Sequence, residues 1–115
     1  MNKSIFIVLI AVCMASCTSH KNIQKTDEMP ACLESTIKTL SSDPSQGIPQ
    51  SISRYTYKGQ TVYYVRAACC DKYNIVYDSN CNILGYPDGG FSGRGDGKML
   101  DFKTNATGGE VIWRQ

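Results

Sequence analysis

The spacing of apolar residues predicts one helix near the start of the folded part of the chain. Between Pro30 and Leu40, the residues Leu33, Ile37 and Leu40 recur at helical spacing and therefore share one face. Pro30 suits the first turn, where a missing amide hydrogen costs nothing. The polar run Ser41–Pro44 ends the helix. We expect the apolar face to pack on a sheet.

A β-hairpin follows, because two stretches rich in β-branched and aromatic residues flank a tight turn. The strands are Ile52–Tyr57 and Gln60–Ala67, and the turn is Lys58–Gly59. The turn fixes the register of the hairpin. The predicted cross-strand pairs are Tyr55 with Val62 and Ile52 with Val65.

Further short strands complete a sheet. A second hairpin turns at Ser79–Asn80, and a last strand follows a pair of glycines. These strands are predicted at Asn74–Asp78, Cys81–Leu84 and Glu110–Arg114. One helix followed by about five short strands predicts a small α+β domain in which the helix packs on an antiparallel sheet.

The beginning of the chain predicts a lipoprotein signal peptide over residues 1–16. Lys3 provides a basic start, and the apolar run Ile5–Val12 is too short to span a bilayer. The sequence Met14–Cys17 resembles a lipobox, which implies cleavage before Cys17 and attachment of palmitate-like chains to that cysteine. An ordinary secretory signal peptide is the alternative.

The predicted mature chain has a polar tether at residues 17–29 and one domain at residues 30–115. Acyl chains on Cys17 would hold the domain on a membrane without a spanning helix. We therefore expect a lipid-anchored protein of the bacterial cell envelope. Thr18 follows the lipidated cysteine where an aspartate would retain the protein, and this is typical of sorting to the outer membrane.

Charge argues against a nucleic-acid partner. The chain has 12 basic and 10 acidic residues, and loss of Lys3 with the signal peptide leaves eleven against ten. Binding to a phosphate backbone requires a large excess of basic residues. We therefore expect a protein or glycan partner.

The cysteines indicate an oxidised, exported domain. Beyond Cys17 there are four of them: Cys32, Cys69, Cys70 and Cys81. An even number in a small exported domain predicts two disulfides. Adjacent cysteines on a strand point to opposite faces, so we expect Cys69 to pair with Cys32 and Cys70 with Cys81. A zinc site is the alternative, although it lacks a Cys-x-x-Cys pair and a nearby histidine.

An enzyme is disfavoured because the domain lacks a histidine base. The only histidine, His20, lies in the predicted tether. A serine or cysteine nucleophile would have no imidazole partner. A hydrolase that uses two carboxyl groups remains an alternative. Its candidate aspartates are Asp71, Asp78, Asp88, Asp96 and Asp101.

The stretch Pro87–Lys98, "PDGGFSGRGDGK", is the candidate ligand segment. The dipeptides Asp88–Gly89 and Asp96–Gly97 favour two successive turns at the edge of the sheet, because glycine accepts positive φ and aspartate bonds to nearby amides. The stretch is not a P-loop, since Ser92 and Met99 replace the required glycine and hydroxyl residue.

Calcium binding is an alternative interpretation of this segment. Asp88, Asp96 and Asp101 would supply carboxylate oxygens, but the spacing of an EF-hand loop is missing. We therefore assign no cofactor to the chain and keep calcium as the alternative. The triplet that runs from Arg94 to Asp96 also matches a receptor-binding motif, although three residues coincide easily.

Several of these motifs together resemble a family of small uncharacterised bacterial lipoproteins. They are Cys69–Cys70–Asp71, Tyr77–Asp78 and the PDGG…GxGDGK pattern of Pro87–Lys98. The resemblance covers roughly residues 32–113 and implies that the glycine-rich segment is a family feature. Many members have cysteines near positions 85 and 99, where this chain has Gly85 and Met99. The resemblance implies no activity.

The leading functional prediction is a non-enzymatic binding module of unknown ligand, held on the bacterial envelope. Its predicted interface is the edge from Asp88 to Asp101 together with neighbouring tyrosines. A secreted inhibitor of a protease or other enzyme, acting through the loop around Arg94, is one alternative. The carboxylate-based hydrolase is the other.

Overall fold

The computed structural model describes residues 29–43, 45, 47–69 and 71–115. The predicted signal peptide, most of the tether, His20 and Cys70 lie outside the described residues. No helix in the described part of the chain is long and apolar enough to cross a membrane. The predicted α+β domain is confirmed: a helix packs on a five-stranded antiparallel sheet.

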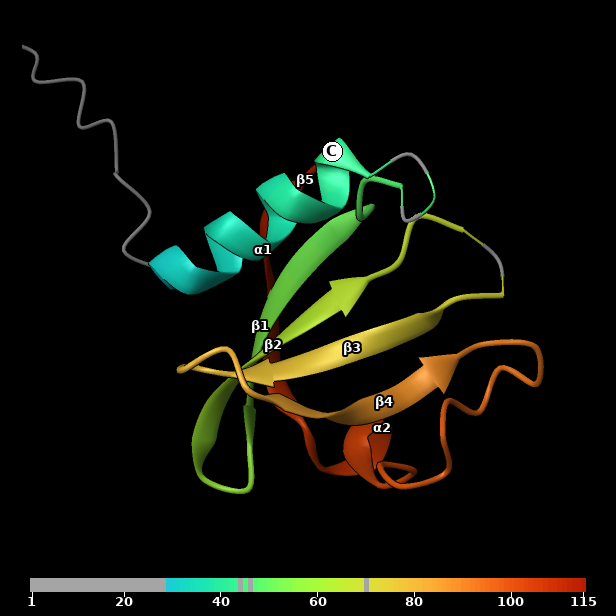
Figure 1. Cartoon of the computed structure of the whole chain (residues 1–115). Coiled ribbons are helices and arrows are strands. Elements are labelled where there is room, and N and C mark those ends of the chain that lie inside the picture. Colours follow the sequence, from blue (N-terminus) through green and yellow to red (C-terminus); the bar gives the residue numbers. More distant parts are fainter. Residues whose placement is uncertain (1–28, 44, 46, 70) are drawn as a thin grey trace, which may run out of the picture.

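The predicted helix is α1, Ala31–Ser42, and it covers one side of the sheet (Figure 1). Leu33 and Ile37 are buried, as the apolar spacing predicts, and Leu40 is half-buried. Pro30 precedes the first turn, and the Leu33 amide donates to the Pro30 carbonyl over 2.9 Å. Met29, just before the helix, also packs against this core.

The five strands are β1 (Ser51–Tyr57), β2 (Gln60–Arg66), β3 (Tyr73–Asp78), β4 (Ile83–Gly89) and β5 (Thr107–Arg114). Their order across the sheet is β4-β3-β2-β1-β5, so β4 and β5 are the edges. Both cross-strand pairs predicted for the β1–β2 hairpin are confirmed. The last strand of the sequence therefore returns beside the first.

The sheet separates two apolar clusters. On the side of α1, the cluster contains Leu33, Ile37, Ile52, Tyr63, Val65 and Tyr77. The other side buries Tyr57, Val62, Val76, Met99 and Phe102. Since both clusters draw alternate residues from the same strands, the sheet is the middle of three layers.

A short helix, α2 (Phe102–Asn105), belongs to the third layer and was not predicted. It lies on the side of the sheet away from α1 (Figure 1). Its Phe102 is buried, and its ring lies 5.2 Å from that of Tyr57 and 5.5 Å from that of Tyr55. The segment from the glycine-rich stretch to α2 thus covers the second face.

The predicted limits of the last two strands were wrong. β4 runs from Ile83 to Gly89, so the first residues of the glycine-rich stretch are strand and not loop. Pro87 is tolerated because β4 is an edge strand, where a missing amide hydrogen need not interrupt the ladder. β5 starts at Thr107 and contains both glycines that were expected to precede it.

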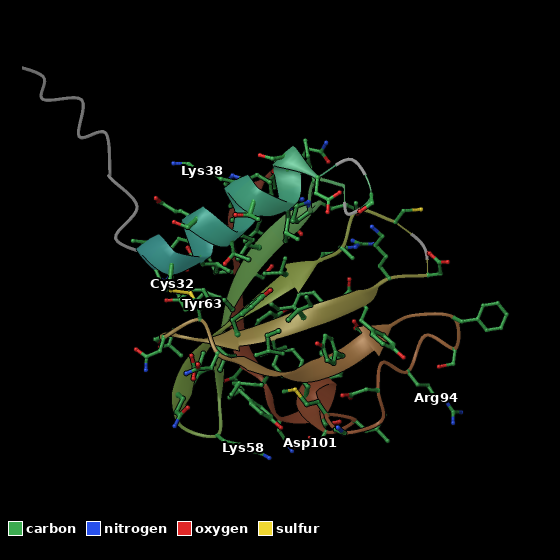
Figure 2. All side chains as sticks on the ribbon, in the orientation of Figure 1. Cys32, Lys38, Lys58, Tyr63, Arg94 and Asp101 are labelled. Carbon is green, nitrogen blue, oxygen red and sulfur yellow. A yellow bond between two sulfur atoms is a disulfide. The ribbon has the colours of Figure 1, made fainter. Side chains whose placement is uncertain are left out.

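The predicted disulfide pairing was also wrong: Cys32 bonds to Cys81, with their Cα atoms 6.1 Å apart. Cys81 lies in the turn between β3 and β4 and packs against the cluster under α1. Cys69 is disulfide-bonded too. The alternation argument failed because β2 ends at Arg66, before the cysteine pair, so strand alternation no longer fixes the direction of Cys69. Figure 2 shows Cys32 at the start of α1.

Gly85 and Met99 are in contact across the second core. A Cβ atom on Gly85 would lie 3.9 Å from the Met99 Cβ and would collide with the Met99 sulfur. Two cysteines with Cβ atoms at this separation can form a disulfide. Positions 85 and 99 are therefore neighbours, with a methionine packed over a glycine.

The variant Gly85→Cys/Met99→Cys is expected to form an additional disulfide. This disulfide would close a loop of about 15 residues. By restricting the unfolded chain, it would stabilise the oxidised form by about 3 kcal/mol relative to the reduced form. Thermal unfolding with and without a thiol reductant measures this difference. Wild type is the control, because it loses its native disulfides in the same way; an identical difference in both proteins would contradict the prediction.

Candidate functional site

The glycine-rich stretch is fastened to the edge strand by backbone hydrogen bonds. The Gly95 amide donates to the Gly89 carbonyl over 3.1 Å, and the Asp96 amide donates to the Tyr86 carbonyl over 3.1 Å. Gly95 has φ +62°, and a Cβ atom there would overlap the Tyr86 carbonyl. The segment folds back on β4 as successive turns, which leaves Arg94 exposed.

The three aspartates considered as calcium ligands lie in three separate parts of the structure and have different partners. Asp96 accepts a bond from the Lys98 amide over 3.0 Å within its own turn. Asp101 accepts the Tyr57 hydroxyl at 2.9 Å and lies 3.7 Å from the Lys58 ammonium (Figure 2). Asp88 lies elsewhere, on β4. Within the described ranges, no group of three or more potential metal ligands is present.

The pKa shifts of the acidic residues run against an acid catalyst. The Tyr57 hydroxyl, followed by the Asn105 amide, lowers the pKa of Asp101. The Asn82 backbone amide lowers the pKa of Asp78 in the turn between β3 and β4. A general acid at neutral pH needs a raised pKa. The Asp78 carboxylate therefore caps its turn by accepting the Asn80 and Asn82 amides, whereas the Asp101 carboxylate holds the Tyr57 hydroxyl and the Asn105 side chain.

Asp88 is the centre of a hydrogen-bonded network below the glycine-rich segment. One carboxylate oxygen accepts the Tyr64 hydroxyl over 2.9 Å and the Asn74 amide over 2.6 Å. The Lys103 ammonium lies 3.4 Å from the other oxygen, and only 14% of the Asp88 side chain is exposed. The Asn74 side-chain oxygen Oδ1 in turn accepts a hydrogen bond from the Ala67 backbone amide over 2.8 Å. The network joins β2, β3, β4 and α2.

The network depends on the Tyr64 phenol being protonated. Burial, and then its hydrogen bond to Asp88, raises the pKa of the Tyr64 phenol. A phenolate would lose the proton it donates and would face the negative carboxylate. The phenol therefore stays neutral and fixes the position of Asp88 at physiological pH.

An open, polar groove of about 460 Å³ adjoins the Asp88 network on the sheet face that carries α2. Its floor comes from β1, β2 and β5, and Lys103 of α2 reaches it from above. The residues that form it are Ser51, Ser53, Tyr55, Tyr64, Arg66, Asn74, Asp88, Gly89, Gly93, Lys103, Val111 and Arg114. Of the candidate ligand residues Asp88, Arg94, Asp96 and Asp101, only Asp88 lines it.

Sequence reasoning missed the basic residues of the groove. Arg66 lies opposite Ser51 in the β1–β2 hairpin, and Arg114 lies opposite Ser51 on the other side, in β5. The hairpin register, which was predicted correctly, already placed Arg66 beside Ser51. Nothing local in the sequence indicates that β5 pairs with β1, so Arg114 could not be placed.

The tyrosines divide between core and groove. Tyr57 and Tyr63 are buried, which supports sheet packing as their role. Tyr55 and Tyr64 are half-buried, line the groove and meet edge to face with their ring centres 6.3 Å apart. Of these tyrosines, Tyr64 bonds directly to Asp88.

Residues 38–115 match DUF6970, a domain of unknown function, and the chain belongs to this family. The match contains the whole sheet, α2 and the groove, but it starts after Cys32 and the first turns of α1. No curated protein matches the chain. No solved structure matches it either.

The substitution Asp88→Ala is expected to destabilise the fold by about 1–3 kcal/mol, because it leaves the Tyr64 hydroxyl and the Asn74 amide without their acceptor. Urea unfolding followed by circular dichroism measures the change. Asp71→Ala is the matched control, since Asp71 is exposed, and should change stability by less than about 0.5 kcal/mol. Equal effects of the two substitutions would contradict a structural role for the network.

Proposed function

We propose that this protein is a lipid-anchored binding module of the bacterial envelope that holds its ligand in the groove beside Asp88. The single observation that carries the proposal is the groove itself, an open volume of about 460 Å³ with polar side chains on a sheet floor. Concave sites with a few converging polar groups are the usual form of a binding site.

The composition of the groove favours binding over catalysis. Among its described lining residues, Asp88 is the single carboxylate, and histidine and cysteine are missing. Glycoside hydrolysis uses two carboxyl groups that flank the bond to be cleaved. Asp88 is also committed to Tyr64, Asn74 and Lys103. The carboxylate-based hydrolase therefore gains no support from this site.

The arrangement of the domain suits attachment through its N-terminus. The proposed tether precedes α1, which lies on one side of the sheet, whereas the groove lies on the other side. Figure 2 shows Cys32 and Arg94 at opposite ends of the molecule. A lipid on Cys17 would thus leave the groove open to a ligand away from the membrane.

The inhibitor alternative has weaker support, because the backbone around Arg94 is folded back. The flanking residues Gly93 and Gly95 have φ of +73° and +62°, far from the extended backbone through which enzymes read bound peptides. Arg94 itself is exposed. A substrate-like loop would need the extended form.

Lipid attachment is testable with one substitution. Cys17→Ser should abolish labelling by an alkyne-tagged palmitate in cells and move the protein from the membrane to the soluble fraction, because it removes the thiol proposed to carry the acyl chains. Cys13→Ser is the control and should label like wild type. Labelling that persists in Cys17→Ser would rule out the proposed anchor.

Occupancy of the groove is testable by photo-cross-linking in cells. A benzoylphenylalanine in place of Val111, which is 42% exposed and lines the groove, should give discrete cross-linked products. The same residue in place of Thr39, which is exposed on α1, is the control and should give none. Products from both positions, or from neither, would contradict binding in the groove.

A further inference from the structure

We infer that the groove binds an oxyanion, a phosphoryl or carboxylate group of a ligand with at least two negative charges, between Arg66 and Arg114. This inference rests on the proposed binding function and adds the chemical class of the ligand. Ser51 lies between the two arginines, and Lys103 faces them from α2.

The register of the sheet sets the two arginines on either side of one serine. Ser51 of β1 is the partner of Arg66 in β2 and of Arg114 in β5. Directly opposed residues of antiparallel strands project from the same face. Because neighbouring strands lie about 4.8 Å apart, the two arginine backbones are about 10 Å apart. Two guanidinium groups can converge on one anion over this distance.

The groove has a local excess of positive charge. Its described lining contains Arg66, Lys103 and Arg114 against the single carboxylate of Asp88, a difference of +2. Near the surface, like charges at this separation repel one another, and an anion between them removes the repulsion. The complete chain has a formal net charge of +2, so this small region holds an excess equal to that of the whole molecule.

Asp88 does not neutralise the two arginines. Its oxygens already accept Tyr64 and Asn74, and its nearest cation is Lys103 at 3.4 Å. Arg66 and Arg114 make no ion pair among the described residues. Arg54, on the opposite face of β1, shows the contrast, since its guanidinium lies 2.6 Å from the Glu110 carboxylate. The sheet thus provides an acidic partner for Arg54, whereas Arg66 and Arg114 in the groove are left for a ligand.

The residue types fit an oxyanion. A guanidinium presents parallel N–H donors that match two oxygens of a phosphate or carboxylate. The Ser51 hydroxyl can donate a further bond from the floor, and the Lys103 ammonium adds a point charge from the opposite wall. A dianion would meet donors from β1, β2, β5 and α2.

The test is thermal unfolding of the full chain, purified in a non-ionic detergent, with pyrophosphate or citrate as the probe. Sodium chloride adjusts all samples to equal ionic strength. An anion that binds only the folded state raises the midpoint, by about 6–11 °C at ten times its dissociation constant. If only pyrophosphate raises the midpoint, the ligand carries a phosphoryl group. If only citrate raises it, the ligand carries a carboxylate group.

The double variant Arg66→Gln/Arg114→Gln should lose the shift. Lys38→Gln/Lys98→Gln, which removes the same charge from two exposed lysines outside the groove, should keep it. Lys103→Gln provides a second groove variant and should reduce the shift. A shift that is the same in wild type and in both groove variants would overturn the inference, as would no shift with either anion.

The outcome is separable from that of the proposed function. Cross-linking at position 111 without any anion shift would keep the binding module and reject the oxyanion as its ligand class. An anion shift that is lost in Arg66→Gln/Arg114→Gln, without cross-linking in cells, would keep the oxyanion site and reject the groove as an occupied binding surface in the envelope.

Discussion

Four consecutive residues of β2, Val62–Val65, point alternately to the two faces of the sheet, and three of them are almost completely buried. A sheet with apolar side chains on both faces must be covered on both, or it would expose a large apolar surface to water. The helix that precedes the sheet covers one face. The segment between β4 and β5, with Met99 and Phe102, covers the other.

Covering the second face explains the composition of the glycine-rich segment. The chain must turn tightly at the end of β4 and return along its edge, and Gly89, Gly90 and Gly95 all have positive φ with no room for a side chain. Met99 and Phe102 then fill the space above Val62 and Val76. Turn formation and packing account for this segment, and its aspartates cap turns or support neighbouring side chains. The same segment covers the outer edge of β4.

The elements predicted from the sequence were those that local patterns determine. The helix and the β1–β2 hairpin follow from spacing and turn residues within a few positions, and both were confirmed.

The misses involve distant partners. Pro87 was assigned to a loop because its position on an edge strand depends on the order of all five strands in the sheet. The Cys32–Cys81 bond depends on where α1 crosses the sheet, and α2 is too short for a periodic signal. Of the groove residues, Asp88 was already a candidate ligand residue from the sequence, whereas the pairing of β5 with β1 was needed to bring Arg114 to Ser51.

The groove exists because the third layer is shorter than the sheet beneath it. Phe102 covers the end of the hairpin near Tyr57, whereas the opposite end, at Ser51, remains open and carries Arg66 and Arg114. Apolar residues at these positions would be exposed, so charged ones are expected there on solubility grounds alone. Solubility does not explain why both charges have the same sign across one serine, since an oppositely charged pair would be equally soluble and would attract. The nearby Asp88 carboxylate does not relieve the repulsion between Arg66 and Arg114, because it is already bonded to Tyr64, Asn74 and Lys103. A bound anion would explain why the fold places these two like charges together.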